Sequence, residues 1–292
     1  MPLILDGKKL SLEIQSEIKS EIEKLVAQGK RLPHIAAVLV GNDGASSSYV
    51  NSKIKMCKQV GMVSTFLHLN ENISETELLK VVHDLNADDN IDGFIIQLPL
   101  PKHINETNII EAIDPKKDVD GFHPVNLGRM QLGLPAFVSA TPAGIMTMLE
   151  RYNIETTGKH CVVIGRSNIV GTPMSILLSR NANPGNCTVT LCHSKSKNLK
   201  EICLQADILI AALGKPEFVR RDMIKEGAVV IDVGISRVDA ENEKGYAIKG
   251  DVKFDEVAPK CSAISPVPGG VGLMTVVSLL MNTMKARRNN EN

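Results

Sequence analysis

Tyr49 and Lys53 are two residues of this sequence whose types and spacing would allow them to act together on a substrate. They stand four positions apart in a segment expected to be a helix from about Ser47 to Gln59. Residues at this spacing share one helix face, so both side chains could reach one substrate. Taken alone, however, the Tyr-x-x-x-Lys pattern is common, and it favours a solvated lysine on an amphipathic helix.

Gln97 and a pair of acidic residues are further polar candidates. Gln97 follows an apolar run over 91–96 that predicts a strand, and ligands of open α/β sheets gather at the carboxyl ends of strands. The prolines of the following Leu-Pro-Leu-Pro segment should stiffen that loop, although a plain turn explains them as well. Asp118 and Asp120 stand among turn residues, and their spacing alone favours an exposed Asx turn.

A glycine-bearing turn from Gly165 to Gly171 predicts a phosphate site. It joins an expected strand over 161–164 to a helix, and the backbone N–H groups of such a turn can face a phosphate. The dinucleotide pattern G-x-G-x-x-G is imperfect, because Ser167 and Val170 replace its second and third glycines and Gly171 comes one place late. The spacing alone is therefore weak evidence.

The next expected strand, over 188–192, strengthens this interpretation. NAD sites usually carry an acidic residue at that strand end to bind the ribose 2′-hydroxyl, whereas this strand runs into His193-Ser194-Lys195. The missing acid favours NADP, and Arg166 in the first turn is a candidate partner for its extra phosphate. A second glycine-rich segment, over 266–272, precedes an apolar helix expected from about Met274 to Met284.

Composition excludes several classes of function. Lysine plus arginine and aspartate plus glutamate each number 33 among 292 residues, so nothing favours nucleic acid or an acidic membrane surface as a partner. The first residues are charged too early for a signal peptide, and no apolar run approaches membrane-spanning length, so we expect a cytoplasmic protein. Six scattered cysteines and seven histidines show no ligand spacing, which predicts reduced thiols and no metal.

Helix and strand patterns alternate along the chain and predict an α/β fold. Ser74 and Glu77 form a capping box that should begin a helix, and Thr141-Pro142 opens another. An earlier helix has an apolar face over 10–25 and should end before Gly29. The other expected strands cover residues 35–40, 65–69, 208–211 and 229–233.

Five segments, in this order, resemble the bifunctional methylenetetrahydrofolate dehydrogenase/methenyltetrahydrofolate cyclohydrolase family: 49–53, 97–101, 117–122, 165–173 and 266–272. The resemblance runs from about Asp6 to Thr275. It implies an α/β catalytic lobe over 1–141, a Rossmann-type NADP-binding lobe over 142–272, and a C-terminal helix over 273–292 that returns to the catalytic lobe. It also implies a folate cleft where the lobes face each other, a homodimer, no formyltetrahydrofolate ligase domain, and a place in one-carbon metabolism and purine biosynthesis.

The resemblance also implies residue roles. Lys53 is the catalytic residue, Tyr49 orients and stacks on the folate, Gln97 bonds to Lys53, and Asp120 binds the pterin edge. A hydride leaves methylenetetrahydrofolate, water attacks the resulting methenyl cation, and a lysine made neutral by burial can serve this second step. The remaining substrate-binding residues would be Leu98, Pro268, Gly269 and Gly270. The cofactor-binding residues would be Gly165, Arg166, Ser167, Ser194, Ile235 and Thr275.

The sequence departs from the family at a few positions. Leu273 stands where proline is usual, Ala140 stands where cysteine is common, and residues 183–186 look like an insertion in a helix-to-strand turn. Three alternatives remain open: a dehydrogenase with little or no cyclohydrolase activity, a non-catalytic nucleotide-binding regulator, and a shikimate- or amino-acid-type dehydrogenase. The joint presence of Tyr49, Lys53, Gln97 and Asp120 argues against the last two.

Overall fold

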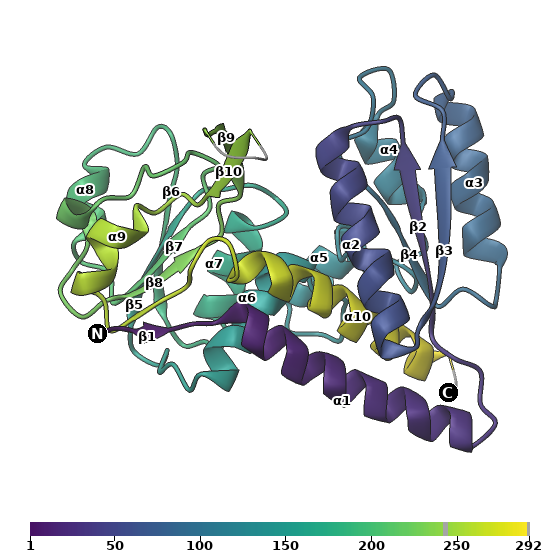
Figure 1. The fold of residues 1–292 in the computed structure, drawn as a ribbon, viewed down its shortest axis with the longest axis horizontal. Coiled ribbons are helices and arrows are strands. Elements are labelled where there is room, and N and C mark those ends of the chain that lie inside the picture. The colour runs from purple at the N-terminus through teal and green to yellow at the C-terminus, as the bar shows by residue number, and fades with distance from the viewer. Residues whose placement is uncertain (242–244, 291–292) are drawn as a thin grey trace. The chain divides into compact units, whose positions relative to one another are not determined.

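The computed structural model describes residues 1–241 and 245–290 and divides into two compact units, each with its own parallel sheet (Figure 1). Unit 1 comprises Met1–Ser11 and Thr141–Thr275, and unit 2 comprises Leu12–Ala140 and Val276–Asn292. Two separate sheets in an alternating α/β chain agree with the expected two-lobed α/β class.

Unit 1 contains a six-stranded sheet in the order β1-β11-β8-β7-β5-β6, and all its neighbouring strands run parallel. The chain passes from β5 to β6 on one side and then to β7 on the other, so the strand order reverses between β5 and β7. Ligands of open α/β sheets bind outside the carboxyl ends of the strands at such a reversal. The strands are β1 (Leu3–Ile4), β5 (His160–Ile164), β6 (Thr188–Cys192), β7 (Ile208–Ala211), β8 (Val229–Asp232) and β11 (Ala263–Ile264).

Helices and a small hairpin surround this sheet (Figure 1). Every residue of β7 is buried, as expected for a strand with both faces covered. One core cluster packs apolar residues of β5, β7 and β8 against the partly buried Leu199, Ile202 and Phe254. The remaining elements are α6 (Ala140–Arg151), α7 (Gly171–Ser179), α8 (Leu199–Cys203), η1 (Arg221–Met223), β9 (Ser236–Asp239), β10 (Tyr246–Lys249), α9 (Phe254–Val257) and η2 (Ala258–Lys260).

Unit 2 is built on a three-stranded parallel sheet in the order β3-β2-β4, with β2 (His34–Val40), β3 (Val63–Leu69) and β4 (Gly93–Ile96). Alternate residues of β2 enter a core cluster with Leu78, Val82 and Ile109, which lie on α3 (Glu75–Ala87) and α4 (Glu106–Ala112). The intervening residues of β2 are buried too. Both faces of β2, the central strand of the sheet, are therefore covered.

The other helices of unit 2 are α2 (Gly44–Val60), α5 (Pro124–Gln131) and most of α1 (Gly7–Ala27) and α10 (Val271–Asn289). The expected capping box of α3 is present, with the Ser74 hydroxyl accepting from Glu77 N and the Glu77 carboxylate accepting from Ser74 N. The apolar face expected on α1 is buried at Leu10, Ile14, Ile18 and Ile22.

The C-terminal helix packs in unit 2 from Val276 onward, as the resemblance implied. Nδ2 of Asn282 donates to Val119 O at 2.8 Å and to Val138 O at 3.0 Å, and Arg287 donates to Arg31 O at 3.1 Å. The helix is longer than the apolar pattern predicted, because it begins at Val271 and continues to Asn289. The apolar pattern ends near Met284 because the last turns of the helix are polar, so the pattern predicted too short a helix.

The start of one strand needs correction. The strand expected to begin at Ile91 begins at Gly93, because the N–H of Ile91 closes a turn on Asp88 O and that of Asp92 donates to His34 O.

The N–H of Leu273 donates to Gly270 O at 3.3 Å, a bond that the family's usual proline could not make. This bond restrains the chain at Leu273.

The six cysteines are buried and unbonded to one another, as expected. Within the described residues, no group of three or more histidine, cysteine, aspartate or glutamate side chains could hold a metal ion. Nor does any helix in that part of the chain combine the length and apolar character needed to cross a membrane.

Candidate active site

Helix α2 places Lys53 in the interior of unit 2. Asp43 caps its start by accepting from Ser46 N at 2.7 Å, and Gly61 ends it in a left-handed conformation with φ of 86°. The Lys53 side chain is only 5% exposed, and its Nζ lies 5.1 Å from the centre of the Tyr49 ring. The alternative of a solvated lysine on an amphipathic helix is therefore wrong.

Gln97 contacts Lys53 from the end of β4. The backbone of Gln97 donates to Val38 O at 2.9 Å, which continues the β2–β4 ladder to the strand end. Nζ of Lys53 donates to Oε1 of Gln97 at 3.2 Å, and Nε2 of Gln97 donates to Leu98 O at 2.7 Å. Because the amide nitrogen of Gln97 donates to the carbonyl of Leu98, its amide oxygen is the atom that faces Lys53.

The segment that carries Asp120 runs beside β4. Phe94 forms a parallel bridge with Asp118, and Phe94 N donates to Lys117 O at 2.9 Å. The side chain of Val119 occupies the place where a Cβ on Gly93 would stand, so this glycine permits the close approach. Asp120 and Gln97 therefore both lie at the carboxyl edge of this sheet.

Asp118 forms the turn that follows. Its Oδ1 accepts from Gly121 N at 3.0 Å and from Phe122 N at 3.2 Å, while its Oδ2 accepts from His123 N at 2.8 Å and from Asn126 Nδ2 at 2.9 Å. The expected exposed Asx turn is wrong, because these backbone bonds come from residues three to five positions further along the chain rather than two, and because Asp118 is 1% exposed. Its neighbours α5 and β4 bury it, which a short motif does not reveal.

Burial controls the electrostatics of Lys53 and Asp120. It lowers the pKa of the Lys53 ammonium from its ordinary value, and the nearby Asp120 carboxylate offsets part of this shift. Burial also raises the pKa of Asp120, against the opposing influence of Lys53. Both shifts favour uncharged forms, so Lys53 can present a neutral amine at a lower pH than an exposed lysine can.

Unit 1 carries the predicted phosphate turn. Gly165 has φ of 121°, and a Cβ there would collide with Ala212 O. A Cβ on Gly171 would collide with Gly165 O, so Gly171 performs the close-packing role of the missing third glycine. Oγ of Ser167 accepts from Val170 N at 3.2 Å and more weakly from Gly171 N at 3.4 Å.

The end of β6 lies beside this turn, because Ile164 pairs with Cys192 and Gly165 N donates to Cys192 O at 2.9 Å. Arg166 and Ser194 are exposed at the ends of these neighbouring strands. Ser194 is not a helix cap, since α8 begins after Asn198. The hydroxyl that closes the local turn belongs to Ser196, which accepts from His193 N at 2.9 Å.

The other predicted residues of unit 1 lie near the start of α10. The side chain of Ile235, which is 54% exposed, packs where a Cβ on Gly272 would stand, at 2.7 Å from its Cδ1. Oγ1 of Thr275 lies 3.0 Å from Oγ1 of Thr141. Gly269 O accepts from Lys8 N at 2.9 Å, which fixes the loop that includes Pro268 and Gly270.

Sequence reasoning missed Asn282. This side chain is 9% exposed and joins α10 to the carbonyl of Val119, the residue before Asp120. It stands within an apolar helical run, and a polar residue in such a run is the signal that could have identified it.

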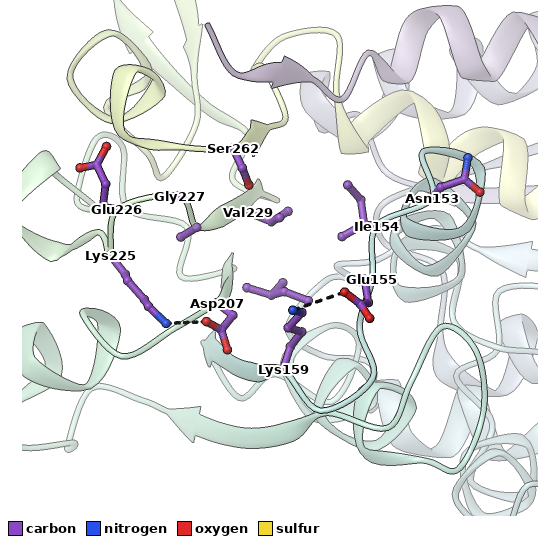
Figure 2. A pocket seen from close by; sticks show the side chains of 12 residues that line it. Asn153, Ile154, Glu155, Lys159, Asp207, Lys225, Glu226, Gly227, Val229 and Ser262 are labelled. Atoms are coloured by element: carbon purple, nitrogen blue, oxygen red, sulfur yellow. Dashed lines mark hydrogen bonds and ion pairs between the residues drawn. The ribbon is translucent and has the colours of Figure 1, made fainter.

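A cavity of about 310 Å³ in unit 1 is not the predicted site (Figure 2). Its lining includes Lys159, Asp207, Val229 and Ser262, which lie at the amino ends of strands, opposite to the edge where α/β sheets bind ligands. Figure 2 shows its lysines directed at acidic neighbours, with Lys225 bonded to Asp207 and Lys159 lying 3.4 Å from Glu155.

Comparisons with known proteins cover both units. Residues 5–120 match the catalytic domain of tetrahydrofolate dehydrogenase/cyclohydrolase, and residues 139–291 match the NAD(P)-binding domain of the same family. A bifunctional protein FolD from Cytophaga hutchinsonii is 63% identical over 284 residues, which cover 97% of this chain and 98% of that protein.

Two solved structures are similar over nearly their whole length. The FolD methylenetetrahydrofolate dehydrogenase/cyclohydrolase from Campylobacter jejuni has a TM-score of 0.93 at 47% identity, covering 99% of both chains. The methylenetetrahydrofolate dehydrogenase-cyclohydrolase from Trypanosoma brucei, complexed with NADP cofactor and an inhibitor, has a TM-score of 0.94 at 33% identity. That match covers 100% of this chain and 99% of the other.

Proposed function

Since the chain belongs to the tetrahydrofolate dehydrogenase/cyclohydrolase family, we propose that it catalyses both reactions, with Lys53 as the residue that serves the hydrolytic step. In the first reaction, 5,10-methylenetetrahydrofolate and NADP⁺ give 5,10-methenyltetrahydrofolate and NADPH. In the second, water adds to the methenyl cation and a proton is released to give 10-formyltetrahydrofolate. The chain thus acts in one-carbon metabolism.

The observation that carries the proposal is the partly buried hydrogen bond from the buried Lys53 to Gln97. A lysine that is 5% exposed and whose pKa is lowered by burial can hold a neutral amine beside a cationic substrate without charge repulsion. Gln97 accepts an N–H of this amine through its oxygen, so the lone pair on Nζ stays available to remove a proton from water.

Tyr49 and Asp120 complete this group in unit 2. Tyr49 flanks the Lys53 amine with its ring, and we assign it to orienting the folate by stacking. Asp120 is assigned to the pterin edge, where a carboxyl can accept from the ring nitrogens. Leu98, Pro268, Gly269 and Gly270 are the other proposed substrate contacts.

The chain fits NADP in unit 1, where Gly165 and Gly171 form a turn that any Cβ would fill. Bound NADP supplies the hydride acceptor. Ser167 stabilises this turn through Val170 N, and Arg166 and Ser194 are the proposed partners of the ribose 2′-phosphate, because no acidic residue follows β6. Ile235 and Thr275 are the remaining proposed cofactor contacts.

The proposal extends to organisation. Residues 142–272 are assigned to NADP, and residues 1–141 together with residues 273–292 are assigned to folate. Met1–Ser11 nevertheless cluster with the unit that contains residues 142–272. We further propose a homodimer located in the cytoplasm. Sedimentation of the purified protein would measure the first of these properties.

One spectrophotometric experiment tests the function. The purified protein is mixed with methylenetetrahydrofolate and NADP, and then with methenyltetrahydrofolate without any nicotinamide cofactor. Formation of NADPH in the first mixture and accelerated hydrolysis in the second are the expected results. NADPH formation without accelerated hydrolysis would leave a dehydrogenase alone, and inactivity in both mixtures would overturn the proposal.

A further inference from the structure

Two carboxylates outside the folate and NADP contacts are buried at the carboxyl edge of the unit 1 sheet. Asp232 is the last residue of β8, and Asp251 follows β10 by two positions. Their side chains are 3% and 0% exposed, respectively. Buried carboxylates are costly unless hydrogen bonds satisfy them, so their partners indicate what they do.

Asp251 binds the loop that follows β7. Its Oδ2 accepts from Leu213 N at 2.7 Å and from Gly214 N at 3.0 Å, and its Oδ1 accepts from Lys215 N at 2.7 Å. Three successive backbone donors thus converge on one side chain. A bond to a charged acceptor is stronger than one between neutral groups, so this carboxylate fixes the conformation of the loop.

The same loop forms one wall of the phosphate turn. It begins at Ala212, whose carbonyl oxygen stands where a Cβ on Gly165 would lie. Ala212 N in turn donates to Ile164 O at 2.8 Å. Since the strand order reverses between β5 and β7, the loop that Asp251 holds lies at the place where open α/β sheets bind nucleotides.

Asp232 binds the neighbouring loop and the backbone of Asp251. Its Oδ1 accepts from Gly234 N at 3.0 Å and from Asp251 N at 2.8 Å, and its Oδ2 accepts from Val252 N at 2.9 Å. Gly234 precedes Ile235, one of the proposed cofactor contacts. A Cβ on Gly234 would collide with the Asp251 carboxylate, and one on Gly250 would collide with that of Asp232.

We propose that Asp251 and Asp232 are positioning residues of the cofactor site, which hold the loops after β7 and β8 in their binding conformation before NADP arrives. This inference rests on the proposed function of unit 1. Six backbone N–H groups bind the two carboxylates, so their oxygens face the protein's own loops rather than a substrate. A loop that is ordered in advance binds its ligand more tightly, because less conformational entropy is lost on binding.

The test is Asp251→Asn, assayed for both reactions. The amide nitrogen of asparagine cannot accept a hydrogen bond, so at least one of the three loop N–H groups loses its partner. We expect the KM for NADP and the dissociation constant for NADP to rise about tenfold or more, since bonds to charged groups are among the stronger ones. Hydrolysis of methenyltetrahydrofolate, measured without nicotinamide cofactor, should stay within about twofold of the unmodified protein.

Asp207→Asn is the matched control. Asp207 also accepts a backbone N–H, that of His160 at 2.9 Å, but it lies at the opposite edge of the same sheet. It should leave the KM for NADP unchanged. If Asp251→Asn also leaves it unchanged, or if both reactions of that variant fall in parallel, the carboxylates do not act on the cofactor site and the proposal is overturned.

Hydrogen exchange of the unmodified protein provides a second test, which does not require the variant to fold. The amides of Leu213, Gly214 and Lys215 should be protected already in the cofactor-free protein. Protection that develops only when NADP is added would mean that the cofactor orders the loop, which contradicts the proposal. An unmodified protein with protected amides but no NADP-dependent activity would instead refute the proposed function and leave the carboxylate contacts intact.

Discussion

The amide oxygen of Gln97 lies 3.2 Å from Nζ of Lys53, because the amide nitrogen of Gln97 donates to Leu98 O at 2.7 Å. If the amide of Gln97 were flipped, its N–H group would donate to Nζ of Lys53 and occupy the lone pair of that nitrogen. The backbone of the proline-rich loop therefore determines that Gln97 accepts from Lys53. This arrangement makes Gln97 a means of testing the state of the amine.

Gln97→Glu should move the pH profile of the cyclohydrolase reaction to higher pH. Burial lowers the pKa of Lys53, and a neighbouring carboxylate would favour the ammonium and raise that pKa again. In the proposed mechanism the neutral amine of Lys53 is the active form. The fraction of neutral amine rises with pH, so the variant would need a higher pH to reach the same fraction. The measurement is the initial hydrolysis rate of methenyltetrahydrofolate across pH.

The control for this change is Gln97→Ala, which removes the acceptor without adding charge. It should lower the rate without the shift to higher pH. If the two variants have the same profile, Lys53 does not titrate in the reaction.

Lys53→Met should abolish cyclohydrolase activity while NADP binding is retained. General base catalysis typically contributes about a hundredfold or more, so a loss of that size is expected. Lys55→Met is the matched control, because Lys55 is an exposed lysine two positions along the same helix. Hydrolysis rates and cofactor titrations would be compared, and an Lys53→Met protein that keeps most of its hydrolytic turnover would refute the assigned role.

Much of the site was predictable where short-range rules determine the structure. The one-turn spacing of Tyr49 and Lys53 and the strand-end position of Gln97 follow from local periodicity, and both are present. The same holds for the Ser74 cap, whose partner is three residues away. These patterns could not predict burial, which distinguishes Lys53 from a solvated lysine on the surface of a helix.

Contacts between distant segments were beyond such rules. The parallel pairing of Leu3 with Ala263 and the bonds of Asn282 to Val119 and Val138 join residues that are more than a hundred positions apart. The role of Gly171 in the phosphate turn could not be predicted from the motif either. It replaces the missing third glycine because the backbone passes close to Gly165 at this point. Spacing rules describe an average turn and do not anticipate this path.

Asn282→Ala should destabilise unit 2 and weaken folate binding. It leaves the carbonyls of Val119 and Val138 without this donor, and a buried acceptor left unsatisfied costs about 1–3 kcal/mol. Because Val119 precedes Asp120, we also expect the KM for methylenetetrahydrofolate to rise. Urea denaturation would measure the stability, with the exposed Asn289→Ala as a control that stays within about 0.5 kcal/mol of the unmodified protein. Equal midpoints for the two variants would contradict the role of Asn282.

Arg166→Ala should impair the use of NADP much more than the use of NAD. The first two nucleotide-binding strands, β5 and β6, end side by side, and Arg166 is exposed in the turn after β5 while no acidic residue follows β6. The 2′-phosphate distinguishes NADP from NAD, and loss of a charge-assisted contact to it costs about 1.5–3 kcal/mol, which raises the KM for NADP about tenfold or more. Dehydrogenase kinetics with each cofactor measure this, and Arg220→Ala, which removes an exposed arginine outside the proposed site, is the control. Equal use of both cofactors by the unmodified protein, or an unchanged KM for NADP in the Arg166 variant, would show that this arginine does not read the 2′-phosphate.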